Sequence, residues 1–328
     1  MTGKKRILSG MRPTGPLHLG NLHGALSNWI RMQEEYECFF FIADWHALTT
    51  DYENTGCISE YVKNMMVDWL SAGLSPEKSV LFVQSSIKEH AELFLLLSMI
   101  TPVPWLERNP TYKDQIAHLS NKDLSTFGFL GYPVLQAADI IIYKADGVPV
   151  GVDQVPHVEI TREIARRFNY LHRKVFPEPE AILTETPKIL GLDRRKMSKS
   201  YNNAIYLSDN PDEIASKVAR MITDPNRARK NDPGDPGVCN VFEFHKLYSD
   251  RDMLDRISSE CRKAQIGCVQ CKKLMSANLI KFLEPIYAKR KYYLARPDLI
   301  DSIIASGTEK AGKVARQTMA EVRDAVKI

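Results

Sequence analysis

The sequence has no long apolar segment and few cysteines. Its longest purely apolar runs, such as Leu93 to Leu97, are far too short to cross a lipid bilayer as a helix. No apolar stretch follows the two lysines near the N-terminus, so we expect no signal peptide, a cytoplasmic location and no membrane partner. Because disulfides are rare in the cytoplasm, the six cysteines predict metal ligation or simple packing.

Internal repeats and low-complexity tracts are also absent from the sequence, which excludes a repeat protein. The chain has 328 residues, of which 44% are hydrophobic. That length is sufficient for one domain with a full core and a second, smaller domain. Charged residues make up 26% of the chain, which is ordinary for a globular protein.

Apolar runs typical of buried strands alternate with helical stretches in the first half of the chain. This alternation predicts an α/β fold, with a parallel sheet and right-handed crossover connections. Prolines at 102, 104 and 110 mark a break that we interpret as an insertion, and the pattern turns helical from residue 207. The expected strands are 6–9, 38–43, 80–84 and 148–150, and the expected helices are 18–35, 59–71, 89–100, 132–143 and 153–168.

Positive charge is concentrated in the second part of the chain. Residues 207–328 hold 22 Lys and Arg against 17 Asp and Glu, whereas the chain as a whole has a net charge of +4. The excess is densest between Cys261 and Lys291, which include eight basic residues and one acidic residue. A basic surface of this kind suits a polyanionic partner, although the charge alone is equally typical of a solvated helical surface.

A glycine-containing turn lies between the first expected strand and the first expected helix. Gly15 and Gly20 allow the backbone to approach a ligand closely, and the N-terminus of the following helix attracts anions. His18 can donate a hydrogen bond to a phosphate without carrying a full charge. The run matches neither the dinucleotide fingerprint nor the Walker A loop, so it indicates a phosphate site of another type or, by itself, a simple turn.

This turn, Thr14-Gly15-Pro16-Leu17-His18-Leu19-Gly20-Asn21, resembles the first signature of the class I aminoacyl-tRNA synthetases, in the form typical of the tryptophan and tyrosine enzymes. The second signature of that family is similar to Lys196-Met197-Ser198-Lys199-Ser200. A third element, Gly151 to Gln154, lies at the end of an expected strand, where α/β sheets bind ligands. Residues 43–49, 131–139 and 148–168 also look like the tryptophan enzymes, so the resemblance covers essentially the whole chain.

The resemblance implies a domain organisation and a reaction. Residues 1–206 are expected to form a Rossmann-like catalytic domain, with an inserted segment at about 102–145 for dimerisation and amino-acid binding. Residues 207–328 are expected to form a helical domain that binds the tRNA anticodon. The implied enzyme activates L-tryptophan with ATP and Mg²⁺, transfers it to tRNA(Trp), and works as a homodimer.

The resemblance also assigns roles to single residues. It implies that the catalytic groups are His18, Lys113, Lys196 and Lys199. Asp139 is expected to accept a hydrogen bond from the indole N–H, which can only donate. The residues expected to contact tryptophan are Leu8, His46, Tyr132, Gln136, Asp139 and Gln154. Those expected to contact ATP are Arg12, Pro13, Thr14, Gly20, Asn21, Gly151, Val152, Asp153, Ile189, Lys196, Met197, Ser198, Lys199 and Ser200.

Two residues depart from the pattern of several tryptophan enzymes, which carry Met at the position of Gln136 and Phe at that of Leu8. Tyr132, Gln136 and Asp139 share the spacing Y-x3-Q-x2-D with the tyrosine enzymes, and this spacing places all three on one helical face.

Three alternatives remain open. They are a tyrosine-specific synthetase, a small-metabolite adenylyltransferase of the same fold, and a non-catalytic paralogue that only binds tRNA. The intact His18 and signature lysines argue against the last.

Four of the six cysteines, namely Cys239, Cys261, Cys268 and Cys271, fall within 33 residues of the basic part. Their spacing is C-x21-C-x6-C-x2-C, and its C-x-x-C pair is typical of metal sites. Four thiolates without histidine permit zinc or an iron–sulfur cluster, and four unrelated buried cysteines are the simpler alternative. The pattern resembles a subset of bacterial tryptophan enzymes whose cysteines bind a [4Fe-4S] cluster, which makes that cluster the expected cofactor and zinc the alternative.

Overall fold

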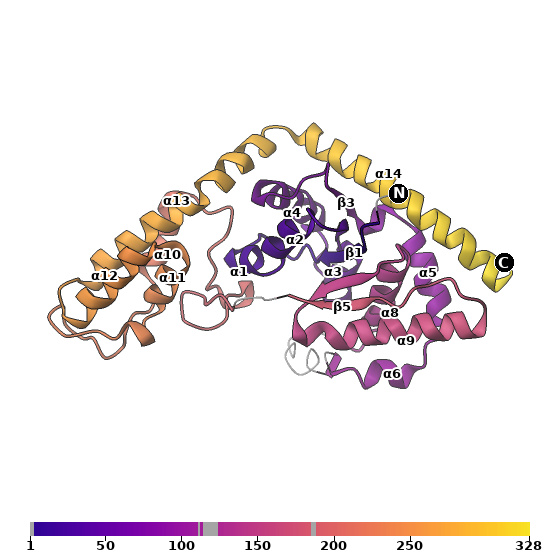
Figure 1. Cartoon of the computed structure of the whole chain (residues 1–328), viewed down its shortest axis with the longest axis horizontal. Helices are drawn as coiled ribbons and strands as arrows, with labels where there is room; N and C mark the ends of the chain where they lie inside the picture. Colours follow the sequence, from indigo (N-terminus) through magenta and orange to yellow (C-terminus); the bar gives the residue numbers. More distant parts are fainter. Residues whose placement is uncertain (1–2, 111, 114–123, 185–187) are drawn as a thin grey trace.

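The computed structural model describes residues 3–110, 112–113, 124–184 and 188–328. Five parallel strands form one sheet in the order β3-β2-β1-β4-β5 (Figure 1), which confirms the expected α/β fold. Four of the strands were expected, and β5 was not. The strands are β1 (Arg6–Met11), β2 (Glu37–Ile42), β3 (Ser79–Val83), β4 (Gly147–Val150) and β5 (Glu180–Leu183).

The sheet is covered on both faces because its central strands are apolar throughout. In β2, Phe39, Phe40 and Phe41 follow one another and are all buried, as is usual for a strand inside a parallel sheet. Their side chains alternate between the faces. Phe40 packs in one core with Trp29 and Trp69, whereas Phe39 and Phe41 pack in a second core with the helices of the other face.

The helices of the sheet body largely follow the expected ranges, with two differences. The expected helix 18–35 is interrupted by a π-helical stretch and ends at Met32. Two helices were not expected, namely α3 after β2 and the short α6 within the proline-marked break. The helices are α1 (Leu19–Asn21), α2 (Ser27–Met32), α3 (Asp44–Asp51), α4 (Ile58–Ala72), α5 (Glu89–Ser98), α6 (Val103–Glu107), α8 (Phe127–Ile141) and α9 (Val155–Leu171), and the π-helical stretch is η1 (Leu22–Leu26). Single turns of 3-10 helix lie at Gln84–Ser86 (η2), Val152–Gln154 (η3) and Lys199–Tyr201 (η4).

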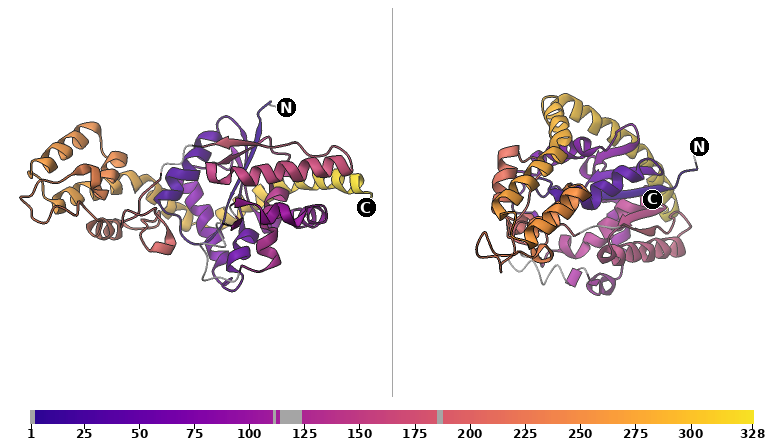
Figure 2. Two further views of the ribbon diagram at one scale, coloured as in Figure 1. Left: turned by 90° about the horizontal axis from the view of Figure 1, so that it is seen from below. Right: turned by 60° about the vertical axis from the view of Figure 1, so that its left-hand side comes forward.

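The chain after residue 207 is helical, as expected. Helices α10 (Pro211–Ala219), α11 (Asn240–Tyr248), α12 (Arg251–Arg262) and the start of α13 (Cys268–Leu294) form a lobe beside the sheet body (Figures 1 and 2). A 3-10 turn, η5 (Pro236–Val238), precedes α11. Local signals explain where these helices begin, since Asn210 accepts from the Glu213 N–H at 3.0 Å and Asp250 accepts from the Met253 N–H at 2.8 Å.

The last helix, α14 (Pro297–Val326), leaves the lobe and packs against β3 and α5. At Gly307 its backbone comes so close to the sheet that an added Cβ would lie 1.7 Å from the Leu81 carbonyl oxygen. Ala311, Ala315 and Met319 are fully buried in the same core as the second face of the sheet. Helix α14 is therefore part of the sheet body, although it lies within the range 207–328. Across the described part of the chain, no helix is long and apolar enough to cross a membrane.

Candidate active site

A cavity of about 360 Å³ opens at the carboxyl ends of β1, β2 and β4. This is the edge at which open α/β sheets bind their ligands. The cavity brings together all six residues that were expected to contact tryptophan, although they come from four separate elements of the chain. They are Leu8 from β1, His46 from α3, Tyr132, Gln136 and Asp139 from α8, and Gln154 from η3.

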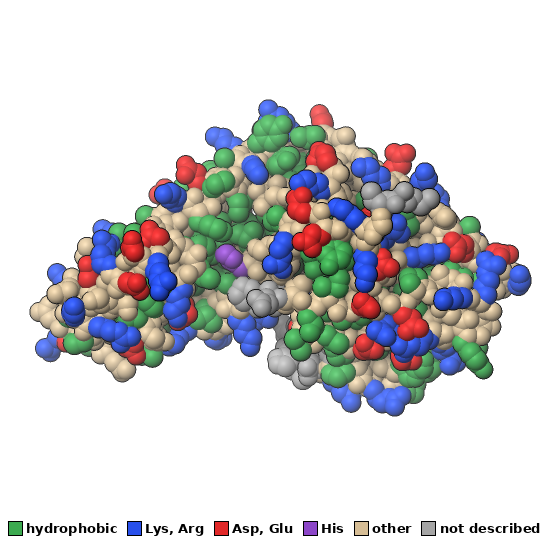
Figure 3. Space-filling view, viewed as in Figure 1, with side chains coloured by type: hydrophobic (Ala, Val, Ile, Leu, Met, Phe, Trp, Pro, Cys, Tyr) green, Lys and Arg blue, Asp and Glu red, His purple; other side chains and the backbone are tan. Residues whose placement is uncertain are grey.

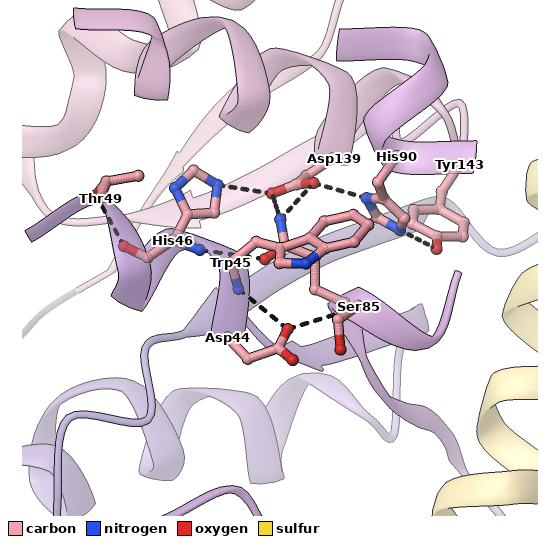
Figure 4. Close-up of polar contacts among 9 residues, drawn as sticks. Asp44, Trp45, His46, Thr49, Ser85, His90, Asp139 and Tyr143 are labelled. Carbon is pink, nitrogen blue, oxygen red and sulfur yellow. Dashed lines mark hydrogen bonds and ion pairs between the residues drawn. The ribbon is translucent and has the colours of Figure 1, made fainter. Parts of the chain in front are cut away.

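Asp139 is the centre of a buried hydrogen-bond network (Figure 4). One carboxylate oxygen lies 2.8 Å from His46 Nε2, and the other lies 2.6 Å from His90 Nδ1. The Gln84 amide donates to both oxygens at 2.8 Å, and His90 Nε2 lies 2.6 Å from the Tyr143 hydroxyl. Burial alone would raise the pKa of Asp139, but the hydrogen bonds from His46 and His90 outweigh it, so the pKa lies below its ordinary value. Asp139 is therefore an anion with about as many donors as a carboxylate accepts.

The two histidines bonded to Asp139 differ in their access to the cavity. His46 lines the cavity, whereas His90 is fully buried behind Asp139. Helix α3 is oriented by Asp44, whose carboxylate accepts from the N–H groups of Trp45 and Ser85 at 3.1 and 3.0 Å (Figure 4).

A second polar group lies on the same wall. The Tyr132 hydroxyl is 3.4 Å from His157 Nε2, and the Asn109 amide is 3.1 Å from His157 Nδ1. Burial lowers the pKa of His157 to about 4, so this imidazole is neutral at physiological pH. Because His157 then offers one donor and one acceptor, it holds the Tyr132 hydroxyl at a fixed place facing the cavity.

The first signature turn is tightly built around His18. Gly15 has a φ of +119°, a conformation that L side chains rarely adopt, and a Cβ at Gly20 would lie 2.9 Å from the His18 ring. Burial, assisted by the charges of Lys199 and Lys196, lowers the pKa of His18 to about 4. His18 is therefore neutral, and its buried Nδ1 has no hydrogen-bond partner. An unpaired nitrogen of this kind fits a phosphate-binding role.

The second signature reaches back to the first. Lys199 Nζ donates to the Gly15 carbonyl oxygen at 2.9 Å and lies 3.4 Å from the Thr14 hydroxyl. Burial lowers the pKa of Lys199 to about 8. The chain that follows runs antiparallel to His18, with which Tyr206 forms a bridge. These contacts hold the two signatures side by side although they are far apart in the sequence.

The remaining residues that were expected to contact ATP differ in their exposure. The side chains of Met197 and Ile189 are buried in the core, so these residues can meet a ligand only through their backbone. The Met197 N–H donates to the Ile189 carbonyl oxygen at 2.9 Å. Arg12 and Gly151 line the cavity. Pro13 is buried, and the Asn21 side chain accepts from the His18 N–H. The expected catalytic residue Lys113 is exposed. Other exposed residues of this set are Thr14, Val152, Asp153, Lys196 and Ser200.

The four clustered cysteines lie together in the lobe around Arg227. Arg227 Nη1 is 3.8 Å from Cys261 Sγ and 3.9 Å from Cys268 Sγ. Burial and the other three thiols raise the pKa of Cys271 to about 12. Nevertheless, among the residues that the structure describes, no three His, Cys, Asp or Glu side chains close around a common point as ligands of an ion do.

Several residues of the site were not found from the sequence. These are Gln84, His90 and Tyr143 behind Asp139, and Asn109 and His157 beside Tyr132. His90 could have been found from the sequence, because it is a polar residue on the apolar face of the expected helix 89–100. It is fully buried in α5. No local pattern indicated Gln84, because it lies in a single turn after a strand.

The family model for tRNA synthetases class I (W and Y) matches residues 1–284. The chain belongs to this family. The synthetase is 54% identical to tryptophan–tRNA ligase of Thermotoga maritima over 98% of this chain and 99% of the relative. It is 47% identical to tryptophan–tRNA ligase of Aquifex aeolicus, over 98% of this chain and 100% of the relative. Its fold is similar to the crystal structure of tryptophanyl-tRNA synthetase from Campylobacter jejuni complexed with ADP and tryptophan, with a TM-score of 0.91, 33% identity, and coverage of 98% of this chain and 100% of that one.

Proposed function

We propose that this synthetase is a tryptophan–tRNA ligase that activates L-tryptophan with ATP and transfers it to tRNA(Trp). The observation that carries the proposal is the cavity lined by both Asp139, whose pKa is lowered, and Tyr132, together with the contact between the two signatures. ATP–pyrophosphate exchange with each of the twenty amino acids tests it. Exchange with tryptophan alone is expected, and exchange that depends on tyrosine instead would replace the proposal by the tyrosine-specific alternative.

In the first step, a tryptophan carboxylate oxygen attacks the α-phosphorus of ATP. The bond from that phosphorus to the bridging oxygen breaks, and pyrophosphate leaves. In the second step, a ribose hydroxyl of the tRNA attacks the acyl carbon and AMP leaves. The protein has little covalent chemistry to perform, so it acts by orienting the reactants and by stabilising the charge that develops on phosphate oxygens.

The joined signatures are placed to hold ATP. Lys199, with Lys196 and Lys113, supplies positive charge to the departing pyrophosphate, and neutral His18 donates to a phosphate oxygen. Mg²⁺ accompanies ATP and is held mainly by the phosphates. Asp153 accepts from the ATP ribose. The rest of the ATP site is formed by Arg12, Pro13, Thr14, Gly20, Asn21, Gly151, Val152, Ile189, Met197, Ser198 and Ser200.

The cavity wall is suited to the amino acid. Asp139 accepts from the indole N–H, and Leu8 provides apolar contact on the strand beneath. Tyr132 and Gln154 meet the amino or carboxylate end. His46 and Gln136 line the pocket beside the ring.

The cysteine group fits an iron–sulfur cluster better than a single zinc ion. A cubane cluster separates its four ligand sulfurs more widely than one zinc does, so its ligands need not close around a point. Burial raises the pKa of Cys239, and the backbone N–H groups near its sulfur offset this only in part. At Gly234 a Cβ would lie 2.8 Å from Cys261 Sγ, so only glycine leaves room for that sulfur. We therefore propose that the four cysteines hold a [4Fe-4S] cluster with a structural or tRNA-docking role.

Cys268→Ser tests the cluster. Protein purified without oxygen is expected to be brown, with a broad absorption at about 400 nm, and Cys268→Ser is expected to lose this colour and some thermal stability. Exchange with tryptophan should persist, since Cys268 begins α13 in the lobe and does not line the cavity at the sheet. Cys57→Ser is the matched control, because Cys57 is exposed and outside the group. Colourless anaerobic protein with stoichiometric zinc would contradict the cluster.

The lobe is the proposed tRNA-anticodon-binding region, and its Lys and Arg side chains are spread over the face seen in Figure 3. Arg229 and Lys273 are exposed and line a basic cavity of about 630 Å³ at the start of α13. Lys272 is less suitable for testing tRNA contacts by substitution, since its amine donates to the Ala219 carbonyl oxygen at 2.8 Å and so caps α10.

The partners proposed for the whole enzyme are tRNA(Trp), ATP, tryptophan and a second copy of the chain in a cytoplasmic homodimer.

Charge reversal at Arg229 and Lys273 is expected to weaken tRNA binding at least tenfold and to reduce the slope of log affinity against log salt by about two, one for each lost phosphate contact. Exchange without tRNA should not change. Lys313→Glu, at an exposed position on α14, serves as the control. Binding titrations at four or more salt concentrations measure both quantities, and an unchanged slope would remove this surface from the proposed interface.

A further inference from the structure

Two polar side chains lie behind Asp139 without lining the cavity. His90 on α5 and Tyr143, which lies just after α8, are both fully buried. The ring centroids of Phe41 and Phe82 lie 6.2 and 6.3 Å from that of His90, and the Phe82 centroid lies 5.4 Å from that of Tyr143. In such apolar surroundings a polar pair is costly unless its hydrogen bonds are satisfied, so the places of its protons are closely defined.

Hydrogen bonding decides which nitrogen of His90 carries the proton. The Tyr143 hydroxyl is 2.6 Å from His90 Nε2, and among the residues that the structure describes this nitrogen is its one hydrogen-bond partner. The hydroxyl keeps its proton, because burial raises the pKa of Tyr143 well above its ordinary value. It therefore donates to Nε2, since a proton on Nε2 would leave the hydroxyl hydrogen buried without an acceptor. The imidazole then carries its proton on Nδ1.

This Nδ1–H holds one oxygen of Asp139 and not the other. His90 Nδ1 lies 2.6 Å from Asp139 Oδ1, whereas His46 Nε2 lies 2.8 Å from Oδ2 (Figure 4). The Gln84 amide is 2.8 Å from both oxygens, so it does not distinguish between them. Oδ1 is thus held from the buried side, and Oδ2 lies on the side of the histidine that lines the cavity.

We propose that Tyr143 and His90 are positioning residues for the recognition of tryptophan. The Tyr143 hydroxyl keeps the His90 proton on Nδ1, and this N–H anchors Oδ1 of Asp139, which leaves Oδ2 on the cavity side to accept from the indole N–H. Neither residue touches the substrate, so both act through Asp139. The proposal rests on the function proposed above, in which Asp139 reads the indole nitrogen.

Tyr143→Phe tests the proposal because it removes one hydroxyl and keeps the ring. The probes are tryptophan and benzothienylalanine, an analogue in which sulfur replaces the indole N–H. Without the hydroxyl, the His90 proton is free to move to Nε2, and the anchor on Oδ1 weakens. The dissociation constant of tryptophan, measured by calorimetric titration, is expected to rise about fivefold or more, the effect of weakening one buried hydrogen bond. The dissociation constant of the analogue should change by less than about twofold, because it has no N–H to present.

The comparison of the two ligands separates positioning from a merely structural role. Structural damage would weaken both ligands alike, and that result would overturn the proposal, as would an unchanged affinity for tryptophan. Tyr170→Phe is the matched control, because Tyr170 is an exposed tyrosine on α9. It should bind both ligands as the natural enzyme does.

Two variants at His90 show which end of the imidazole matters. In His90→Asn the short amide can place an N–H near the position of Nδ1, whereas in His90→Gln the longer amide reaches toward the position of Nε2. Both should lower thermal stability, because each leaves a polar group of the core without its full set of partners. His90→Asn is expected to keep most of the preference for tryptophan over the analogue, and His90→Gln to lose about fivefold or more of it. Equal preferences in the two folded variants would contradict the proposal, and this pair decides if Tyr143→Phe does not fold.

Nitrogen NMR of protein labelled at its histidines reads the tautomer directly, since the two ring nitrogens are distinct. The His90 signals are identified by their absence from His90→Asn. They are expected to show a proton on Nδ1 alone in the natural enzyme, and to move toward the Nε2–H tautomer in Tyr143→Phe. An imidazolium, or a proton on Nε2, in the natural enzyme would refute the assignment.

The outcomes also distinguish the two proposals. If the natural enzyme shows no tryptophan-dependent exchange, the proposed function itself fails. If it exchanges normally and folded Tyr143→Phe discriminates between the two ligands as the natural enzyme does, only the role of Tyr143 and His90 is overturned.

Discussion

Replacing Lys199 by alanine is expected to slow tryptophan-dependent ATP–pyrophosphate exchange by about a hundredfold or more, the effect of losing one preorganised charge donor in a transition state, ~3 kcal/mol. Tryptophan affinity should change by less than about twofold, because Lys199 lies at the signature junction and not on the cavity wall. The loss should appear in kcat, since charge on the departing pyrophosphate grows only as the bond breaks.

Steady-state exchange kinetics and tryptophan titration measure these two quantities. Lys310→Ala, an exposed lysine on α14, is the control for general effects of removing a positive charge. An exchange rate within a few-fold of the control would show that Lys199 does not stabilise the transition state. Because the substitution removes a half-buried lysine whose amine bonds only to the turn, the fold should survive, and thermal unfolding checks this.

Asp139→Asn is expected to reduce the preference for tryptophan over phenylalanine by about a hundredfold or more, since a site built around one polar partner discriminates strongly against a ligand that lacks it. An amide cannot accept the indole N–H and also satisfy the donors Gln84, His46 and His90. The same mismatch should cost about 2–3 kcal/mol of stability through weakened charge-assisted bonds, so kinetics must be measured below the lowered melting temperature.

The ratio of kcat/KM values for the two amino acids is the decisive measurement. Asp255→Asn, an exposed aspartate on α12, is the control. A folded Asp139→Asn enzyme that keeps the full preference for tryptophan would mean that another group recognises the indole nitrogen.

The sheet could be predicted from the sequence because its signals are local. Continuous apolar runs such as that of β2 belong to strands buried on both faces, and the alternation with helices fixes the parallel order. The edge strand β5 has no such run, since its four residues are partly exposed. Helix α3 was missed because its buried face consists of His46, Ala47 and Thr50, which leaves no hydrophobic periodicity. The π-helical stretch in Leu22–Leu26 has the same local pattern as the α-helix around it.

The residues of the cavity wall could be predicted in part from helical spacing and from the family resemblance. Tyr132, Gln136 and Asp139 share a helical face, and the family resemblance added the residues from other elements. The partners of Asp139 could not be predicted, because Gln84 in η2 and His90 in α5 are 55 and 49 residues away in the sequence and meet it only in the folded chain.

The packing of α14 on β3 has a consequence for how the chain is made. The backbone of the outer strand β3 remains uncovered at Leu81 until Gly307 and the small residues after it have been synthesised, which is after the whole lobe. A sheet edge exposed during synthesis is a place where other chains can pair. The growing polypeptide therefore carries an open sheet edge from the synthesis of β3 until α14 has been made, and α14 is the element that covers this edge.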